Sequence, residues 1–264
     1  PMARSVSAEL PAATATCIQR ERCGRSACCT PAMTENAAAT PEPATDNAAA
    51  TATPETATAT TVLFVRHGRT ATTGSVLPGR APGLHLSDDG RADAAGAAAR
   101  LAEVSGVAAV VTSPLERTME TAAPIAAALG LEVTAEPGLL ECDFGEWTGR
   151  SLAELRALPQ WSTVQHTPSR HRFPCGESFV EMSARIVATV DRLVAEHPGQ
   201  RIVCVSHADP IKALLAHAAG THLDHLQRLV VSPCSISVVH YGPAAPAVLT
   251  INSAGTGLGS LTLS

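Results

Sequence analysis

The sequence lacks the features that mark a membrane protein or a nucleic-acid-binding protein. It has no apolar run of roughly 18 residues, the length that a bilayer span requires, so no transmembrane helix is expected. The formal net charge of −5 and the isoelectric point near 6.1 give no reason to expect nucleic acid or an anionic membrane as a partner. Aromatic residues make up only 3% of the 264 residues, so the core has to be built mainly from Ala, Val and Leu.

The cysteines also lack a functional pattern. There are eight, and no two of them have the C-x-x-C spacing of a zinc or redox site. We therefore expect unpaired thiols in a reducing compartment, and a cytoplasmic protein.

The composition divides the chain into three parts. Residues 31–60 are almost entirely Ala, Thr and Pro, with no apolar periodicity and little bulky surface to offset the entropy of ordering. We predict a disordered leader over residues 1–60, of which residues 1–32 precede a start-like Met33 and are expected to be an upstream extension. One folded domain is predicted over residues 61–252, followed by a flexible tail over residues 253–264.

Within the predicted domain, short apolar runs alternate with helical patterns. Strands are predicted at Val62–Val65, Val107–Val111, around Val133, at Ile202–Val205 and at Ser235–Val238. Between them, helices are predicted from Ser87 to Glu103, from Ser113 to Leu129, over Phe179–Leu193 and from Asp209 onward. Ser113 to Glu116 reads as a capping box, and Asp209 reads as an N-cap. This order predicts a three-layer α/β/α sandwich with a mostly parallel central sheet.

Reactive side chains follow three of the predicted strands directly. Arg66-His67-Gly68 follows the first strand, Ser113 with the nearby Arg117 follows the second, and Ser206-His207 follows a later one. Ligands of open α/β sheets bind beyond the carboxyl ends of the strands, so these groups are expected to converge. Two arginines, two histidines and helix N-termini in one crevice favour an anion with the charge of a phosphate.

Four motifs in order resemble those of the histidine phosphatase (phosphoglycerate mutase-like) superfamily, and in particular those of actinobacterial phosphomutase or phosphatase proteins. They are Arg66-His67-Gly68, Ser113 to Ala122 with the pattern Ser-x-Leu-x-Arg-x-x-x-Thr-Ala, Leu139 to Gly145 with Leu-x-Glu-x-x-Phe-Gly, and Ser206-His207-Ala208. The resemblance covers the predicted domain and implies the phosphoglycerate mutase-like fold.

The resemblance implies a mechanism that the residue chemistry also supports. His67 would attack phosphorus and form a phosphohistidine, while Arg66, Arg117 and His207 would hold the non-bridging oxygens. Glu141 would serve as general acid and then as general base, for which its pKa should be raised. No metal or other cofactor is implied. Further substrate contacts are expected from a group near these motifs: Thr70, Thr73, Gly79, Arg80 and Ala208. Thr73 stands where the family often has Asn, and Ala208 stands where it has Gly.

The leading prediction is a metal-independent phosphatase acting on a small phosphorylated metabolite. Three alternatives remain at this point: a phosphoglycerate mutase, a catalytically silent phosphate-binding protein, and a metallohydrolase using His67, His207 and Asp209. The span from Glu141 to His207, shorter than in cofactor-dependent mutases, favours hydrolysis. A homodimer is left open as the assembly state.

Two histidine-containing segments have no assigned role. Arg170-His171-Arg172 is interpreted as a solvated face, with a role over the pocket as the alternative. His222 and His225 are three residues apart but lack a clear third ligand for a metal ion.

Overall fold

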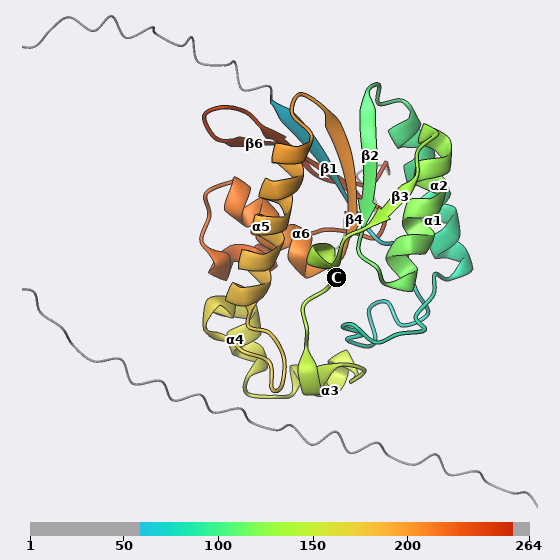
Figure 1. Cartoon of the computed structure of the whole chain (residues 1–264). Helices are drawn as coiled ribbons and strands as arrows, with labels where there is room; N and C mark the ends of the chain where they lie inside the picture. Colours follow the sequence, from blue (N-terminus) through green and yellow to red (C-terminus); the bar gives the residue numbers. More distant parts are fainter. Residues whose placement is uncertain (1–58, 256–264) are drawn as a thin grey trace, which may run out of the picture. The chain divides into compact units, whose positions relative to one another are not determined.

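A mixed sheet of six strands forms the centre of the fold (Figure 1). The computed structural model describes residues 59–255, so the predicted leader lies almost wholly outside the described residues, and most of the predicted tail does too. The strands are β1 (Thr60–Arg66), β2 (Val107–Thr112), β3 (Val133–Ala135), β4 (Arg201–Ser206), β5 (Ile236–Tyr241) and β6 (Pro246–Ser253). Their order across the sheet is β3-β2-β4-β1-β5-β6.

Parallel pairing joins the first four strands of that order, and β5 and β6 add an antiparallel edge. The prediction of a mostly parallel sheet is thus confirmed, and the expected strands are all present. The sequence analysis missed β6, an edge strand in which exposed residues alternate with half-buried ones and none is fully buried.

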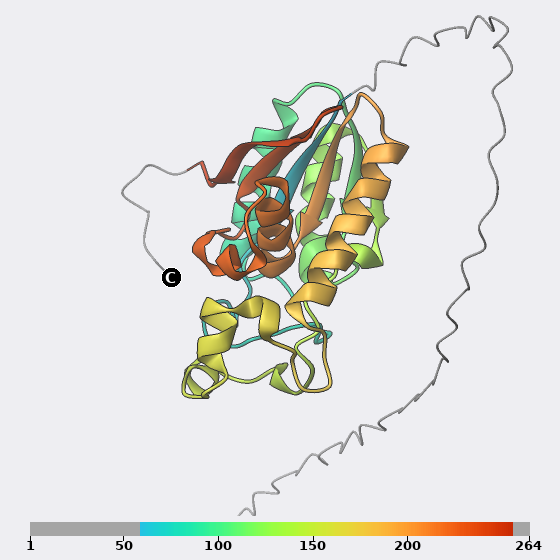
Figure 2. The ribbon, with the colours of Figure 1, turned by 90° about the vertical axis from the view of Figure 1, so that its left-hand side faces the viewer.

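Helices cover both faces of this sheet, as the 90° view in Figure 2 shows. One face carries α1 (Asp88–Ala102) and α2 (Glu116–Leu129). The other face carries α5 (Phe179–Glu196) and α6 (Ala208–Ala218). Between β3 and α5 the chain forms short helices: η1 (Pro137–Leu139), η2 (Gly145–Trp147), α3 (Leu152–Arg156), α4 (Trp161–His166) and η3 (Pro168–Arg170). We call residues 136–178 the β3–α5 segment. A further short helix, η4 (Leu223–Arg228), follows α6.

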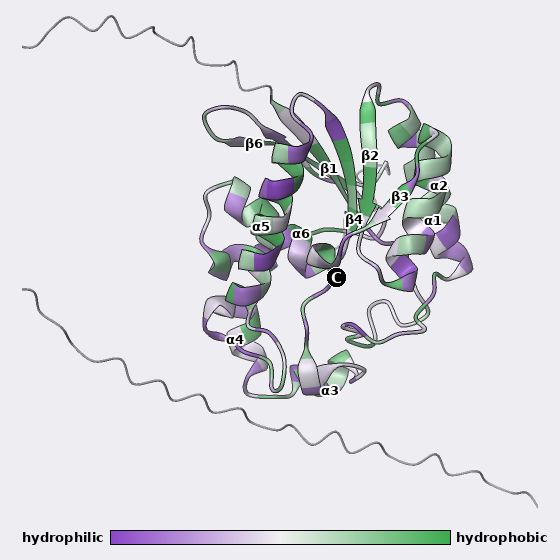
Figure 3. Ribbon diagram, viewed as in Figure 1, coloured by the Kyte–Doolittle hydropathy of each residue, from purple (hydrophilic) through white to green (hydrophobic). Residues whose placement is uncertain are grey.

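The apolar run that predicted β1 is explained by burial on both faces. Val62 and Phe64 pack in the cluster that includes Met182 and Ile186 of α5. Leu63 and Val65 turn to the opposite cluster under α1 and α2. Because successive side chains of a strand point to opposite faces, a strand between two helical layers is apolar throughout. Figure 3 shows the hydrophobic residues along β2 and most of β4.

The long helix α5 follows the predicted stripe. Phe179, Met182, Ile186, Val190 and Leu193 are all buried. The helix begins after Ser178, whose hydroxyl accepts from the backbone N–H of Glu181 in a capping box. Within residues 59–255, no helix is both long and apolar enough to cross a membrane.

Candidate active site

Three neighbouring strands end at the same edge of the sheet and deliver the predicted side chains there. In the order β2-β4-β1, the residues that follow the strands are Ser113, His207 and His67. The backbone N–H of His67 donates to the Ser206 carbonyl at 2.9 Å, and that of Ser113 donates to the Val205 carbonyl at 3.0 Å. These bonds extend the parallel ladder past the strand ends and fix the positions of the reactive residues.

His67 is held as a neutral ring with one protonated and one unprotonated nitrogen. Its Nδ1 lies 2.8 Å from the Gly68 carbonyl, which can only accept, so Nδ1 carries the hydrogen. Nε2 therefore has the lone pair, and it accepts from Arg117 Nε at 3.3 Å. Burial, followed by the charges of Arg66 and Arg117, lowers the pKa of His67 well below its usual value. The neutral ring thus presents the lone pair of Nε2 to the guanidinium group of Arg117.

His207 packs edge-on to His67, with 5.2 Å between ring centroids. Arg117 Nη2 donates to its Nδ1 at 3.2 Å, and its Nε2 lies 2.9 Å from Ser113 Oγ. Since Nδ1 accepts, Nε2 carries the hydrogen and donates to the serine. Burial and the charge of Arg117 lower the pKa of His207 well below its usual value. Both rings are thus neutral, which keeps further positive charge away from a site that already holds two arginines.

The capping box predicted at Ser113 is wrong. Helix α2 begins at Glu116 after Leu115, which has no side-chain cap. Ser113 is instead occupied in orienting His207, and Glu116 Oε1 accepts from the backbone N–H of Gly83. The local sequence pattern gave no sign of these long-range partners, His207 and Gly83.

Arg117 and Arg66 each have a buried nitrogen atom without a hydrogen-bond partner in the described part of the chain. Arg117 is fully buried and donates through Nη2 to the Gly79 carbonyl at 2.7 Å, but its Nη1 has no acceptor. Arg66 donates through Nη1 to the Val231 carbonyl at 2.7 Å, and its buried Nε has no acceptor. A buried charged donor without an acceptor is costly, whereas an anion between these groups would satisfy both.

Glu141 lies in the same buried group with a raised pKa. Its side chain is only 8% exposed, and Oε1 accepts from the backbone N–H of Cys142 at 2.9 Å. Burial, assisted by the negative charge of Asp209, outweighs the two arginines and raises the pKa of Glu141 to about 7. The carboxyl group can therefore hold a proton near neutral pH, as an acid–base residue requires.

A charged network that the sequence analysis missed holds the backbone of Glu141. Arg80 Nε donates to the Glu141 carbonyl at 2.7 Å, and Arg185 Nη2 donates to the same oxygen at 3.3 Å. Both arginines also bind Glu177, whose Oε2 accepts in addition from the backbone N–H of Asp143. The sequence signal that could have identified Arg185 as an inward-facing residue was its position three residues after Met182, on the buried stripe of α5. The guanidinium of Arg80 takes part in this network, and its predicted contact with substrate stays a prediction.

The other predicted substrate contacts lie around the same edge. Thr70 Oγ1 and Thr73 Oγ1 are 3.1 Å apart, and Thr73 Oγ1 also accepts from the Thr70 backbone N–H. Gly79 has a positive φ of 53°, and a Cβ there would lie 2.7 Å from Thr148 Oγ1, so glycine is required where its carbonyl meets Arg117. Ala208 is the first residue of α6. Their contacts with substrate stay predictions.

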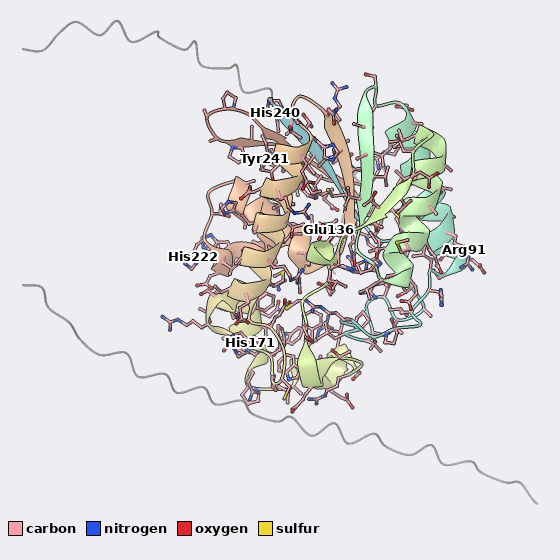
Figure 4. All side chains as sticks on the ribbon, viewed as in Figure 1. Arg91, Glu136, His171, His222, His240 and Tyr241 are labelled. Carbon is pink, nitrogen blue, oxygen red and sulfur yellow. The ribbon has the colours of Figure 1, made fainter. Side chains whose placement is uncertain are left out.

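The structure does not confirm the interpretations of Asp209 and His171. The N-cap of α6 is His207, so the N-cap interpretation of Asp209 is wrong; Asp209 lies 3.7 Å from Lys212 Nζ. His171 is buried in the β3–α5 segment against the rings of Trp147 and Phe173 (Figure 4), so it is not part of a solvated face.

Arg170 and Arg172, the neighbours of His171, are exposed, and Arg172 forms an ion pair with Glu181. His222 accepts at Nδ1 from the backbone N–H of Asp224. Over residues 59–255, no three or more His, Cys, Asp or Glu side chains are grouped to hold a metal ion.

Comparison with known proteins gives one family. The model of the histidine phosphatase superfamily (branch 1) matches residues 62–254. An uncharacterized protein of Mycobacterium tuberculosis, Rv0525, is 39% identical over 171 residues, which are 63% of this chain and 82% of that protein. The bifunctional protein Rv2228c of the same organism is 34% identical over 208 residues, 75% of this chain, and the chain spans only 55% of its length.

A solved structure extends the match to three dimensions. The mycobacterial glucosyl-3-phosphoglycerate phosphatase Rv2419c superposes with a TM-score of 0.67 at 25% identity, over 74% of this chain and 99% of that one.

Proposed function

This chain belongs to the histidine phosphatase superfamily, and from that premise we propose that it hydrolyses a small phosphomonoester without a metal ion, through a phosphohistidine on His67. The observation that carries the proposal is the neutral His67 ring, whose Nε2 lone pair accepts from Arg117. Buried nitrogen atoms of Arg117 and Arg66 have no acceptor among residues 59–255. Such a site combines a nucleophile with an anion receptor. The phosphatase structure named above supports the reaction class.

In the first step, His67 Nε2 attacks phosphorus and the bond from phosphorus to the leaving oxygen breaks. Arg66 and Arg117 hold the non-bridging oxygens, where charge accumulates in a loose transition state. Their fixed positive charge does the electrostatic work that a metal ion does in other phosphatases. Glu141 gives its proton to the leaving oxygen, and a free alcohol departs.

In the second step, a water molecule attacks the phosphohistidine. Glu141, now ionised, takes the proton from that water, and the N–P bond breaks with its electron pair returning to Nε2. Inorganic phosphate leaves and Glu141 is again protonated. A pKa of about 7 suits a group that must both give and take a proton.

The test is a screen of phosphomonoesters with chelator-treated protein. The wild type should release inorganic phosphate from at least one small ester, and His67→Ala should release none. His171→Ala is the matched control, because that ring is also buried but lies in the β3–α5 segment. Activity that disappears with chelator and returns with a divalent metal, or activity retained by His67→Ala, would overturn the proposal. Interconversion of 2- and 3-phosphoglycerate would replace hydrolysis by mutase chemistry.

A further inference from the structure

A cavity of about 250 Å³ lies outside the group of side chains assigned to catalysis, since none of them lines it. One wall comes from the β3–α5 segment, and the other comes from α6 and η4. Figure 2 shows these two parts stacked at the carboxyl end of the sheet, and α4 is in contact with η4.

Two residues tie the cavity to the phosphate-binding groups. Asp209 lines it and stands two residues after His207, and its charge acts on Glu141. Phe144 also lines it and lies against Gly79, whose carbonyl accepts from Arg117. The cavity therefore adjoins the site on the side of Glu141, the group assigned to the leaving oxygen.

Part of the lining is flat and apolar. Phe144 and Phe173 are buried and meet edge-on, with 4.8 Å between ring centroids. Trp161 of α4 adds a third, half-buried ring to the lining. Aromatic walls of this kind favour a ligand with a flat or otherwise apolar body.

The polar part of the lining contains a cation with no partner. Arg156, the last residue of α3, is exposed and makes no hydrogen bond or ion pair with any other described residue. Lys212 is occupied: it donates to Gln227 at 3.1 Å and lies 3.7 Å from Asp209. With Arg156 and Lys212 positive and Asp209 negative, the lining carries one net positive charge.

We propose that this cavity binds the leaving group of the substrate, and that the leaving group is a small alcohol or phenol with a flat apolar body and a remote carboxylate held by Arg156. This rests on the proposed phosphatase function. One unpaired guanidinium and a net charge of +1 match a monoanion, and its planar fork suits a carboxylate. The volume lies below the roughly 300–1,000 Å³ of pockets for drug-sized ligands, so the leaving group is small.

The experiment compares two esters of nearly equal leaving-group acidity, 4-(carboxymethyl)phenyl phosphate and 4-ethylphenyl phosphate. The wild type should prefer the carboxylate ester by about tenfold in kcat/KM, the size expected for one charge-assisted contact. Arg156→Gln should abolish that preference through KM and leave the neutral ester within about twofold. Arg170→Gln, an exposed arginine of the same segment outside the cavity, should keep the preference.

Equal kcat/KM for the two esters in wild type and Arg156→Gln overturns the inference while leaving the phosphatase function intact. If the wild type hydrolyses no ester at all, the proposed function fails, and calorimetry with 4-hydroxyphenylacetate decides the cavity separately. Binding by the wild type that Arg156→Gln loses supports the cavity assignment. Equal binding by both proteins, or none by the wild type, refutes it.

Discussion

Replacing Glu141 by glutamine should stabilise the protein at high pH and do so far less at low pH. The folded state raises the pKa of this carboxyl from 4.5 to about 7. A raised pKa means that the folded protein keeps the proton while the unfolded chain has already lost it. Stability is therefore lost as the pH rises from about 4.5 to about 7, and the loss is complete above that range.

The magnitude follows from the same pKa values. One pKa unit corresponds to about 1.4 kcal/mol, so ionising Glu141 in its buried position costs about 3 kcal/mol at pH 8 and under about 1 kcal/mol at pH 5. Glutamine avoids this cost, because it stays neutral and its Oε1 can still accept from the Cys142 N–H. The stabilisation by Glu141→Gln should thus be about 2–3 kcal/mol larger at pH 8 than at pH 5.

The assay is urea unfolding of wild type and Glu141→Gln at both pH values. Glu132→Gln, at an exposed position outside the site, gives the background for the same exchange. If Glu141→Gln changes the free energy of unfolding equally at pH 5 and pH 8, the carboxyl is not the buried, proton-holding group described above. The reasoning about its catalytic role would fall with it.

Three further predictions concern the rest of the site. The plot of kcat/KM against pH should be bell-shaped. It should fall above about pH 7 as Glu141 loses its proton, and fall in acid as His67, whose pKa is lowered, gains one. A flat profile from pH 5 to 9 would contradict this. Arg117→Lys should reduce kcat by about 10²–10³-fold, because it removes a fork that meets two histidines and a carbonyl; stopped-flow kinetics that show less than a tenfold loss would argue against the assignment. Glu177→Gln should lower kcat with little effect on KM and destabilise the fold by about 2 kcal/mol, since it weakens the network that holds the Glu141 backbone. Steady-state kinetics measure the first effect and thermal melts the second. An unchanged kcat would mean that the network does not position Glu141.

The sequence predicted the layers of the fold because burial on both faces leaves a direct trace. Val62–Val65 is apolar throughout because one helical layer covers each face of β1. The stripe of α5 is equally direct, since each of its predicted apolar residues is buried. The edge strand β6 has no such trace, because only one side of it touches the core.

The site was predictable where its chemistry follows a strand end and unpredictable where long-range partners compete. His67 and His207 directly follow β1 and β4, so the topology alone brings them together. Ser113 looked like a helix cap, but His207, 94 residues away, takes its hydroxyl. The ion pair of Arg80 with Glu177, 97 residues away, was also not predicted. Local patterns contain no record of such partners.

The most direct test of the central claim is to trap the covalent intermediate. The protein is mixed with a hydrolysable phosphomonoester, quenched within milliseconds under alkaline conditions that preserve phosphohistidine, and digested for mass spectrometry. The account predicts an acid-labile phosphoryl group on the peptide that contains His67, absent from His67→Ala and unaffected by chelator. A phosphoryl group on His207 or elsewhere, or hydrolysis that proceeds with no labelled peptide, would contradict it.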